Sequence, residues 1–444
     1  MAEQAIARTL ANFICGLSYD RLPGEVTETA RNLILDLIGA AIAGRDLKFS
    51  HVAVKLARGS KGPASLITYG SGVSAPEAAF ANSVLACGIA QDDVMFSFHP
   101  GVVNIPTALA IAEEQGSSGT EIITAVVAGY DVMGRIYEGA PGIRPAFRDA
   151  SVFGPIAAAA VAGKLFKLNE EQLAHALSLA ANMSSGLREW ALGGAKERDF
   201  FDPLSAKNGI MAATLAREGV DAAAYTLEGK KGFYQAFAGT TERTELVTRD
   251  LGKRFLVMDA RYKPYPACWL LQTPMELAVR LKALHQIKPE DISEVIAKLS
   301  IADATHPGND FEGPFRTMTQ AVLSTQFGAA AAFLGKPVTS YKFYFDCFDD
   351  EEVNAFAHRV RVVGEQDRVI PNITVKLNNG KELSLEQDFA SELIPTEEKV
   401  VAKFNLLALP IIGKARADEI IDTALRLPKI GIREMVGTLV QGIN

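Results

Sequence analysis

Cysteine is scarce in this chain, with 4 residues among 444. These cysteines form no CxxC pair, and none stands at a spacing to histidine that is typical of a metal site. Scattered single cysteines are typical of reduced, mostly buried thiols. The sequence therefore predicts neither a disulfide-stapled fold nor a zinc site, and we expect no bound metal ion. The cysteines are Cys15, Cys87, Cys268 and Cys347.

An excess of positive charge and long apolar runs are also lacking. The formal net charge is −7, and nucleic-acid binding requires a basic surface, so nucleic acid is not an expected partner. The longest apolar stretches, such as residues 32–44 and 153–166, are shorter than the roughly 20 residues that span a bilayer. Met1–Leu10 resembles a polar helix start rather than a leader. We expect no membrane partner and a cytoplasmic location.

The remaining composition is typical of a globular protein with a large core. Hydrophobic residues make up 48% and charged residues 22%, and at ~150 residues per domain the length predicts two or three domains. In the first half, apolar residues recur at steps of three and four, on faces rich in alanine and glycine. Small faces let helices approach closely, so we expect a compact helical bundle. The predicted helices are Thr27–Gly44, Thr120–Arg135, Ser151–Leu165, Glu170–Met183 and Ser205–Glu218.

The sequence pattern changes near residue 260, where Pro264 and Pro266 exclude a helix. Beyond this point several segments alternate like strands, and residues 378–380 (Asn-Asn-Gly) predict a tight hairpin turn. Helical periodicity returns from Thr396. The predicted strands are Glu294–Ile301, Arg359–Val363, Asn372–Leu377 and Lys381–Glu386, and the predicted helices are Thr273–His285, Thr319–Leu334, Ala417–Leu425 and Ile430–Leu439.

These patterns predict a mainly α fold with three segments. Residues 1–259 form the first part of a helical domain, residues 260–393 a smaller α+β domain, and residues 394–444 a helical tail. We expect the tail to close back onto the first domain. The large helical domain is then formed by both chain ends, with the α+β domain inserted.

A histidine follows a pair of aspartates between two runs of small apolar residues. Asp92, Asp93 and His99 lie in a turn-rich segment, and Pro100 with Gly101 interrupts regular structure directly after the imidazole. A group that titrates near neutral pH on a loop edge is typical of a catalytic site. The alternative interpretation is that the aspartates cap a helix and His99 packs under the loop. Because adjacent residues in a loop point apart, we expect one aspartate to orient His99 and the other to cap the next helix.

Six motifs in the same order resemble the MmgE/PrpD family, which contains 2-methylcitrate dehydratases, cis-aconitate decarboxylases and iminodisuccinate epimerases. The resemblance covers nearly the whole chain. It implies a large all-helical domain made of both chain ends, an inserted α+β lid, an active site in the cleft between them, and a homodimer. The motifs are Asp36–Gly39 with Ala43-Gly44, Pro76–Asn82, Asp92-Asp93 with His99–Gly101, Gly129–Arg135, Leu227–Phe233 and Tyr262–Cys268.

The departures from the family pattern are informative. The family motif before its His-Pro pair is Asn-Gly-x-x-x-His-x-x-Asp-x-Asp-Asp-Thr, and here Ser83, Cys87, Ala90 and Val94 replace the Gly, the first His, the first Asp and the Thr. In the dehydratases and decarboxylases the lost aspartate and threonine belong to the catalytic cluster. Their absence makes epimerisation an alternative to dehydration or decarboxylation.

Two arginines stand where the family has other site residues. Arg148 aligns with a second family histidine, and Arg198 aligns with a family lysine. Guanidinium groups bind carboxylates through two parallel hydrogen bonds and stay charged, so the resemblance implies that both anchor an anionic substrate. The alternative interpretation is that they form surface salt bridges with the neighbouring Asp149 and Asp199.

The lysine at the start of the second domain is retained. Two prolines hold Lys263 in an extended loop, where a side chain near other cations can act as a base or proton donor. The alternative is an ordinary exposed lysine. Tyr265 beside it can donate a hydrogen bond to a substrate or serve as a packing residue.

The sequence and the resemblance together predict a cofactor-independent lyase, of the dehydratase or decarboxylase type, that acts on a small di- or tricarboxylic acid. His99, Lys263 and Asp93 are the predicted catalytic residues. The predicted substrate-binding residues are Arg148, Arg198, Asp92 and Tyr265. An epimerase or isomerase of a dicarboxylate is one alternative, and a family member that has lost catalysis and serves as a binding protein is another.

Overall fold

The computed structural model describes residues 5–140 and 142–440, and the chain divides into two compact units. The first unit contains the residues up to Arg188, the segment Arg198–Tyr262 and the residues from Pro395 onward. The second unit contains Glu189–Glu197 and Lys263–Ile394. The segment Glu189–Glu197 thus belongs to the second unit, whereas the sequence pattern places it in the first helical part.

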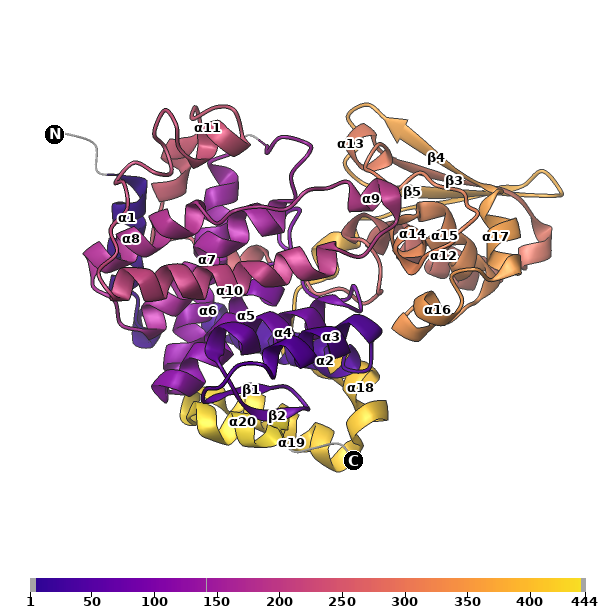
Figure 1. Ribbon diagram of the computed structural model, residues 1–444. Helices are drawn as coiled ribbons and strands as arrows, with labels where there is room; N and C mark the ends of the chain where they lie inside the picture. Colours follow the sequence, from indigo (N-terminus) through magenta and orange to yellow (C-terminus); the bar gives the residue numbers. More distant parts are fainter. Residues whose placement is uncertain (1–4, 141, 441–444) are drawn as a thin grey trace. The chain divides into compact units, whose positions relative to one another are not determined.

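The first unit is built mainly from helices (Figure 1). They include α2, α6, α7, α8 and α10 at the positions of the five helices predicted for the first half of the chain. The helices of this unit are α1 (Ile6–Gly16), α2 (Gly24–Ala43), α3 (Lys48–Ala57), α4 (Ala75–Cys87), α5 (Gly101–Gln115), α6 (Gly119–Glu138), α7 (Asp149–Leu165), α8 (Glu170–Ala181), α10 (Arg198–Arg217), α11 (Phe233–Phe237), α18 (Glu397–Ile412), α19 (Lys414–Leu425) and α20 (Ile432–Val440).

Local sequence explains where several of these helices begin. Ser118 and Glu121 form a capping box at the start of α6, and Asn169 and Gln172 form another at the start of α8. Helix α10 starts at Arg198, well before the predicted start at Ser205. The proline inside α10 interrupts the periodic pattern in the sequence without ending the helix in the structure.

Small residues let α7 and α10 pack very closely. A Cβ atom added at Gly209 in α10 would lie 2.3 Å from the Cβ atom of Ala158 and 2.6 Å from the backbone nitrogen of Ala159, both in α7. A Cβ atom added at Gly154 in α7 would lie 2.7 Å from the Cβ atom of Ser205 in α10. The close helix approach expected from the small faces is therefore present at this contact.

This contact gives a first prediction for stability. The substitution Gly209→Ala is expected to lower the free energy of unfolding by about 1–3 kcal/mol, because the methyl group overlaps the backbone of α7. The matched control is Gly437→Ala in α20, where an added Cβ atom meets nothing within 4 Å. That control is expected to raise stability by roughly 0.5–1 kcal/mol through helix propensity. Denaturant unfolding of both variants measures the difference, and equal effects would contradict the packing argument.

The first unit is not entirely helical, which corrects the expectation of an all-helical domain. Strands β1 (Ala64–Leu66) and β2 (Gly70–Val73) form an antiparallel hairpin. The turn needs left-handed backbone at Thr68 (φ 67°), and Gly70 and Gly72 also have positive φ. The β-branched and aromatic residues of this stretch, Ile67, Thr68 and Tyr69, lie in the turn. The strands themselves, Ala-Ser-Leu and Gly-Ser-Gly-Val, contain little that favours a strand, so the sequence pattern does not predict this hairpin.

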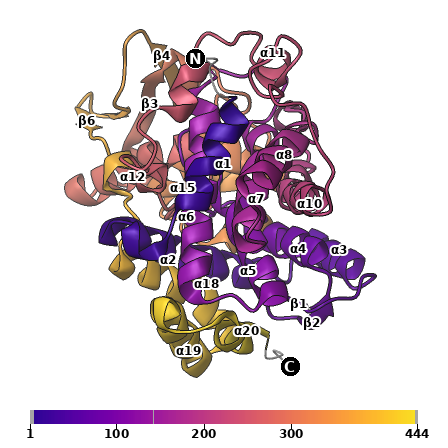
Figure 2. The ribbon, with the colours of Figure 1, turned by 90° about the vertical axis from the view of Figure 1, so that its left-hand side faces the viewer.

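The C-terminal helices pack against earlier parts of the same unit. Helix α18 lies along α2, and a Cβ atom at Gly39 of α2 would lie 3.0 Å from the Phe404 ring of α18. Figures 1 and 2 show α20 beside the β1–β2 hairpin, and α19 packs against α2 and α20. The backbone N–H of Thr68 in the hairpin turn donates to the carbonyl of Leu439 at 2.8 Å. The two ends of the chain thus form one core.

The second unit combines a four-stranded sheet with helices. The strand order is β4-β3-β5-β6, with β3 and β4 parallel and the other pairs antiparallel. Helices α12 and α15 pack against the sheet. The elements of this unit are α9 (Trp190–Gly193), α12 (Trp269–His285), β3 (Ile292–Ser300), α13 (Ile301–Ala304), α14 (Met318–Leu323), α15 (Thr325–Leu334), α16 (Tyr341–Asp346), α17 (Glu351–Ala357), β4 (Val360–Glu365), β5 (Asn372–Leu377) and β6 (Glu382–Glu386).

The strands and the mixed α/β character of this segment agree with the sequence-based prediction, including the hairpin between β5 and β6. One predicted helix is wrong in detail. The segment Thr319–Leu334 is two helices, α14 and α15, because Ser324 has extended backbone and its hydroxyl accepts the N–H of Phe327 as the N-cap of α15.

Candidate active site

The loop between α4 and α5 has a fixed conformation. Ala90 takes the left-handed backbone conformation (φ 56°). Val94 exchanges two backbone hydrogen bonds with Arg261, of 2.9 and 2.7 Å, and Met95 exchanges two with Phe98, of 2.9 and 3.1 Å. The second exchange closes a tight turn that ends directly before His99, so the position of the imidazole is set by the backbone.

His99 is buried and its Nδ1 atom faces two acceptors. It lies 2.8 Å from Asp92 Oδ2 and 2.9 Å from the backbone carbonyl oxygen of Asp93. The backbone carbonyl of Asp93 can only accept a hydrogen bond, so Nδ1 carries the proton and Nε2 is the basic nitrogen of the neutral ring. A carboxylate on Nδ1 also stabilises the imidazolium that forms when Nε2 takes up a proton, as in other histidine–aspartate pairs.

Asp93 has a different role from Asp92. Its Oδ1 accepts the N–H of Gly101 at 3.0 Å, at the start of α5, and its Oδ2 accepts the hydroxyl of Tyr130 at 2.8 Å. A Cβ atom at Gly101 would lie 2.1 Å from Asp93 Oδ1, so this cap needs glycine. The prediction that one aspartate orients His99 and the other caps the next helix is therefore confirmed. The geometry favours Asp93 as a positioning residue over the catalytic role predicted from the sequence.

Burial raises the pKa of Asp93 to about 7. The hydrogen bond from the Tyr130 hydroxyl and the charge of Lys403 lower this pKa, whereas the nearby carboxylates of Asp92 and Asp36 raise it further. The folded-state pKa lies above the ordinary 3.8, so the protonated carboxyl favours the folded state. This contribution to stability is lost as the pH rises from about 4 towards 7.

Asp93→Asn removes this titration and keeps both hydrogen bonds, since the amide can accept from Gly101 and donate to Tyr130. The variant is expected to be more stable than the wild type by about 1–3 kcal/mol at pH 8, with the difference shrinking towards pH 4. Thermal unfolding across this pH range measures the effect. A variant whose advantage grows as the pH falls would contradict the assigned direction of the pKa.

Arg148 and Arg198 are both largely buried, at the starts of α7 and α10. Arg148 donates to Asp202 Oδ2 through Nη2 (3.1 Å) and Nε (3.4 Å), while Ser151 donates to Asp202 Oδ1 at 2.6 Å. Arg198 donates to Asp199 Oδ1 at 3.1 Å and contacts Cys87 Sγ at 3.3 Å. Burial alone would raise the pKa of Asp202, but Arg148 and Arg198 hold it below its usual range.

These groups form one electrostatic cluster within the first unit. His99 lowers the pKa of Asp202, and Asp92 is among the carboxylates that raise the pKa of Arg198 against its burial. His99, Arg148 and Arg198 stand at the N-terminal ends of α5, α7 and α10, and the dipole at a helix N-terminus favours negative charge. The structure therefore brings together Asp92, His99 and the two predicted anchors, and adds Asp202, Ser151 and Cys87, which were not predicted as site residues.

The predicted salt-bridge partners of the arginines are correct only in part. Arg198 does pair with Asp199. Asp149 instead pairs with Arg188 at 3.2 Å and accepts the hydroxyl of Ser97 at 2.8 Å, which ties the turn before His99 to α7. The interpretation of Arg148 and Arg198 as surface residues is wrong, because their side chains are 9% and 13% exposed.

Lys263 and Tyr265 belong to the second unit. Lys263 is 1% exposed and donates to the carbonyl of Ala267 at 3.5 Å, so the interpretation as an ordinary exposed lysine is wrong. The hydroxyl of Tyr265 donates to Glu276, and its backbone N–H donates to Gln272 Oε1 at 3.2 Å. Burial and Glu276 raise the pKa of Tyr265. Their predicted roles in catalysis and substrate binding stay predictions.

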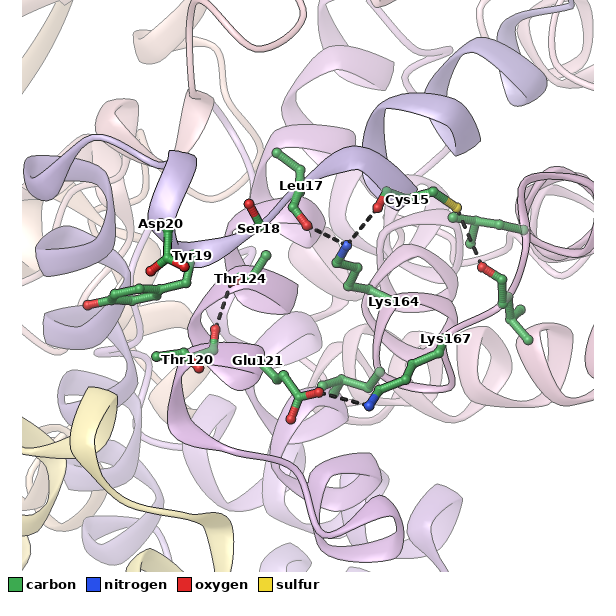
Figure 3. Close-up of a pocket in the computed structure, with 13 residues that line it drawn as sticks. Cys15, Leu17, Ser18, Tyr19, Asp20, Thr120, Glu121, Thr124, Lys164 and Lys167 are labelled. Atoms are coloured by element: carbon green, nitrogen blue, oxygen red, sulfur yellow. Dashed lines mark hydrogen bonds and ion pairs between the residues drawn. The ribbon is translucent and has the colours of Figure 1, made fainter.

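A separate cavity of about 450 Å³ lies in the first unit, between the end of α1, the start of α6 and the end of α7 (Figure 3). Lys164 is one of its lining residues, and its ammonium donates to the carbonyls of Ile14 (2.8 Å), Cys15 (3.2 Å) and Leu17 (2.7 Å). The lysine therefore caps α1. None of the residues of the His99 cluster lines this cavity.

Over residues 5–140 and 142–440, no group of three or more His, Cys, Asp or Glu residues is arranged to hold a metal ion. Within the same residues, no helix has both the length and the hydropathy needed to cross a membrane.

Comparison with known families assigns the chain. The model of the MmgE/PrpD N-terminal domain matches residues 8–245, and that of the MmgE/PrpD C-terminal domain matches residues 265–427. The chain belongs to the MmgE/PrpD family. A cis-aconitate decarboxylase of Aspergillus terreus is 24% identical over 463 residues, covering 97% of this chain and 94% of the relative. The human cis-aconitate decarboxylase is 24% identical over 315 residues, covering 67% and 65%, and the mouse enzyme is 24% identical over 388 residues, covering 82% and 76%.

The geometry also explains the motif Gly129–Arg135 of this MmgE/PrpD protein. In Gly129–Arg135, the glycine lets α6 approach Asn104 of α5, the hydroxyl of Tyr130 holds Asp93, and Asp131 with Arg135 forms a buried ion pair. Most of this motif is therefore structural. Two of its residues lie against the loop that carries His99: Tyr130 holds Asp93, and Gly134 leaves room for the side chain of Met95.

Proposed function

We propose that this MmgE/PrpD protein is a lyase that acts on a small di- or tricarboxylic acid by moving a proton next to a carboxylate. The observation that carries the proposal is His99, whose Nδ1 proton is held by Asp92 and the Asp93 carbonyl beside two buried guanidinium groups. The 24% identity to cis-aconitate decarboxylases over nearly the whole chain supports the same reaction class.

In the proposed chemistry, Nε2 of His99 is the proton-transfer atom. For elimination, it removes the proton beside a carboxylate, and the electrons of the C–H bond form the alkene. The hydroxyl leaves with both electrons of the C–O bond and takes up a proton, for which Lys263 is the proposed donor. For decarboxylation, the C–C bond electrons stay on the carbon that loses CO₂, and the His99 imidazolium then protonates the resulting carbanion. Asp92 stabilises the imidazolium in both cases, and Arg148 and Arg198 bind the carboxylates.

Other features of the proposal come from the sequence and from family membership. Lys263 is the proposed second proton-transfer group, and Tyr265 a proposed substrate contact. The protein is proposed to work without a cofactor, as a cytoplasmic homodimer. Substitution of Lys263 by methionine is the direct kinetic check of its role.

An epimerase or isomerase of a dicarboxylate is the second candidate function. The residues at positions 90 and 94 of the loop support it. Ala90 and Val94 carry no proton to give to a leaving hydroxyl, and Val94 is buried with its backbone paired to Arg261. Elimination needs such an acid, whereas epimerisation needs only one proton-transfer group on each face of the reacting carbon.

Incubation of candidate acids in heavy water separates the reactions. cis-Aconitate is the first probe, followed by hydroxylated tricarboxylates and chiral dicarboxylates, with products followed by proton NMR. A new alkene or released CO₂ that depends on His99 supports the lyase. Deuterium incorporation with inversion and no new alkene supports the epimerase instead.

The third candidate function is that of a family member that has lost catalysis but still binds a carboxylic acid. A thermal-shift screen with the same acids tests it, using Arg148→Ala and Arg198→Ala. Stabilisation that disappears in both variants, with no turnover of any acid, would show a binding protein. Activity that both variants leave unchanged would contradict the anchoring role of the arginines.

A further inference from the structure

A buried lysine from the C-terminal segment reaches the loop that carries Asp92. The ammonium of Lys403, in α18, lies 2.8 Å from Oδ1 and 2.9 Å from Oδ2 of Asp36 in α2, and donates to the backbone carbonyl of Gln91 at 2.6 Å. Lys403 is 5% exposed and Asp36 is 2% exposed. Three residues that lie far apart in the sequence are thus joined by one charged group.

The contact with Gln91 acts on Asp92 through a single peptide bond. The carbonyl of Gln91 and the N–H of Asp92 belong to the same rigid peptide plane, so fixing the carbonyl fixes the direction in which the chain enters Asp92. The preceding residue, Ala90, holds the left-handed conformation (φ 56°), which costs a non-glycine residue free energy and persists only where its surroundings impose it. The charged hydrogen bond from Lys403 supplies such a constraint.

The same pair also acts on the other aspartate of the loop. Asp36 raises the pKa of Asp93 and Lys403 lowers it, together with the larger effects of burial, Tyr130 and Asp92. Lys403 and Asp36 therefore affect both Asp92 and Asp93, the two residues whose oxygen atoms face the Nδ1 proton of His99.

A contribution to fold stability does not by itself explain why the buried Lys403–Asp36 ion pair is present. Replacing a buried ion pair by apolar residues of similar volume is often neutral or stabilising, because both charges must be desolvated. Lysine suits a positional role here, since its compact ammonium pairs with the Asp36 carboxylate and at the same time donates to the Gln91 carbonyl.

We propose that Lys403, held by Asp36, is a positioning residue that sets the Asp92–His99 pair. The inference rests on the proposed function of His99 as the proton-transfer residue. It extends the site to the C-terminal helix α18, which carries none of the residues predicted from the sequence to take part in the reaction.

The test uses a double variant, because Lys403→Met alone leaves the Asp36 carboxylate buried without its lysine. Asp36→Asn with Lys403→Met removes both charges and keeps the volumes close to the original. The matched control is Asp131→Asn with Arg135→Met, which removes another buried pair of the first unit, whose arginine lies 2.6 Å from its aspartate. In the described residues, the hydrogen bonds of the Asp131 and Arg135 side chains go to each other and to residues 249–256, and none goes to residues 90–99.

The first readout does not depend on activity. Nitrogen-15 NMR of histidine-labelled protein distinguishes Nδ1–H from Nε2–H, and with 6 histidines in the chain the His99 signals can be assigned from a His99→Gln spectrum. The wild type is expected to show Nδ1–H. The Asp36/Lys403 variant is expected to show a mixture of both tautomers, and the control is expected to keep the wild-type signals.

The second readout is kinetic, on whichever acid the protein turns over. The Asp36/Lys403 variant is expected to lose roughly 10–100-fold in kcat with KM changed less than about threefold, because a displaced proton-transfer group affects the reaction more than binding. Wild-type His99 signals in the Asp36/Lys403 variant would overturn the inference, whatever the activity. Absence of turnover in the wild type would count against the proposed function alone, since the NMR comparison still decides the positioning role.

Discussion

Replacing His99 by glutamine is expected to lower kcat by about 10³-fold or more while leaving the fold intact. Proton transfer by a positioned side chain contributes roughly 10²–10⁴-fold, and glutamine offers no group that titrates near neutral pH. The amide can still donate to Asp92, so the loop of residues 90–99 is expected to keep its conformation. Steady-state kinetics on the acid identified in the heavy-water experiment, with a circular dichroism spectrum, measure both parts.

Two further variants test whether the loss of activity is specific to His99. Asp92→Asn is expected to cost less than His99→Gln, because the backbone carbonyl of Asp93 still accepts the Nδ1 proton at 2.9 Å. His358→Gln, whose side chain is 56% exposed, is the matched histidine control and is expected to leave kcat unchanged. Equal losses in the His99 and His358 variants would point to a general effect on the protein, and full activity in His99→Gln would exclude it as the proton-transfer residue.

Local sequence signals explain why much of the fold could be predicted. Helices α6 and α8 have their periodic apolar residues and their capping boxes within one segment, so the local sequence is enough to predict them. The Asp92–His99 segment belongs to the same class, because the capping and orienting roles act over fewer than ten residues. The two arginines were found by resemblance, since neither stands in a local motif of its own.

The parts that could not be predicted depend on contacts between distant segments. Asp202 and Arg148 are partners because α7 and α10 pack closely, whereas the sequence neighbour Asp149 was the wrong partner for Arg148. The sequence neighbour Asp199 does pair with Arg198. Lys403 reaches Gln91 only through the packing of α18 on α2. Likewise, nothing in the segment Glu189–Glu197 itself indicates that its contacts lie with the second unit.

The largest expected loss of stability comes from Arg135, which is 2% exposed inside the first unit. Its guanidinium lies 2.6 Å from Asp131 in the same helix and donates to the carbonyls of Arg249 (2.5 Å), Asp250 (3.4 Å) and Arg254 (2.9 Å). One side chain thus ties α6 to the loop of residues 249–254, and Asp131 continues this link by accepting the N–H of Leu256 at 2.9 Å.

Arg135→Met is expected to lower the free energy of unfolding by about 3–5 kcal/mol, because it leaves the Asp131 carboxylate buried without its cationic partner and removes the donor from three carbonyls. Adding Asp131→Asn is expected to restore part of the loss, since the uncompensated charge is then gone. Arg254→Met is the surface control: that arginine is 48% exposed, pairs with Glu138 and Asp259, and is expected to contribute less than about 1 kcal/mol. Urea unfolding of the three variants tests the ranking. An Arg135→Met loss no larger than that of Arg254→Met would mean that water or a rearranged 249–254 loop satisfies Asp131, and that this part of the family motif is not a stabilising centre.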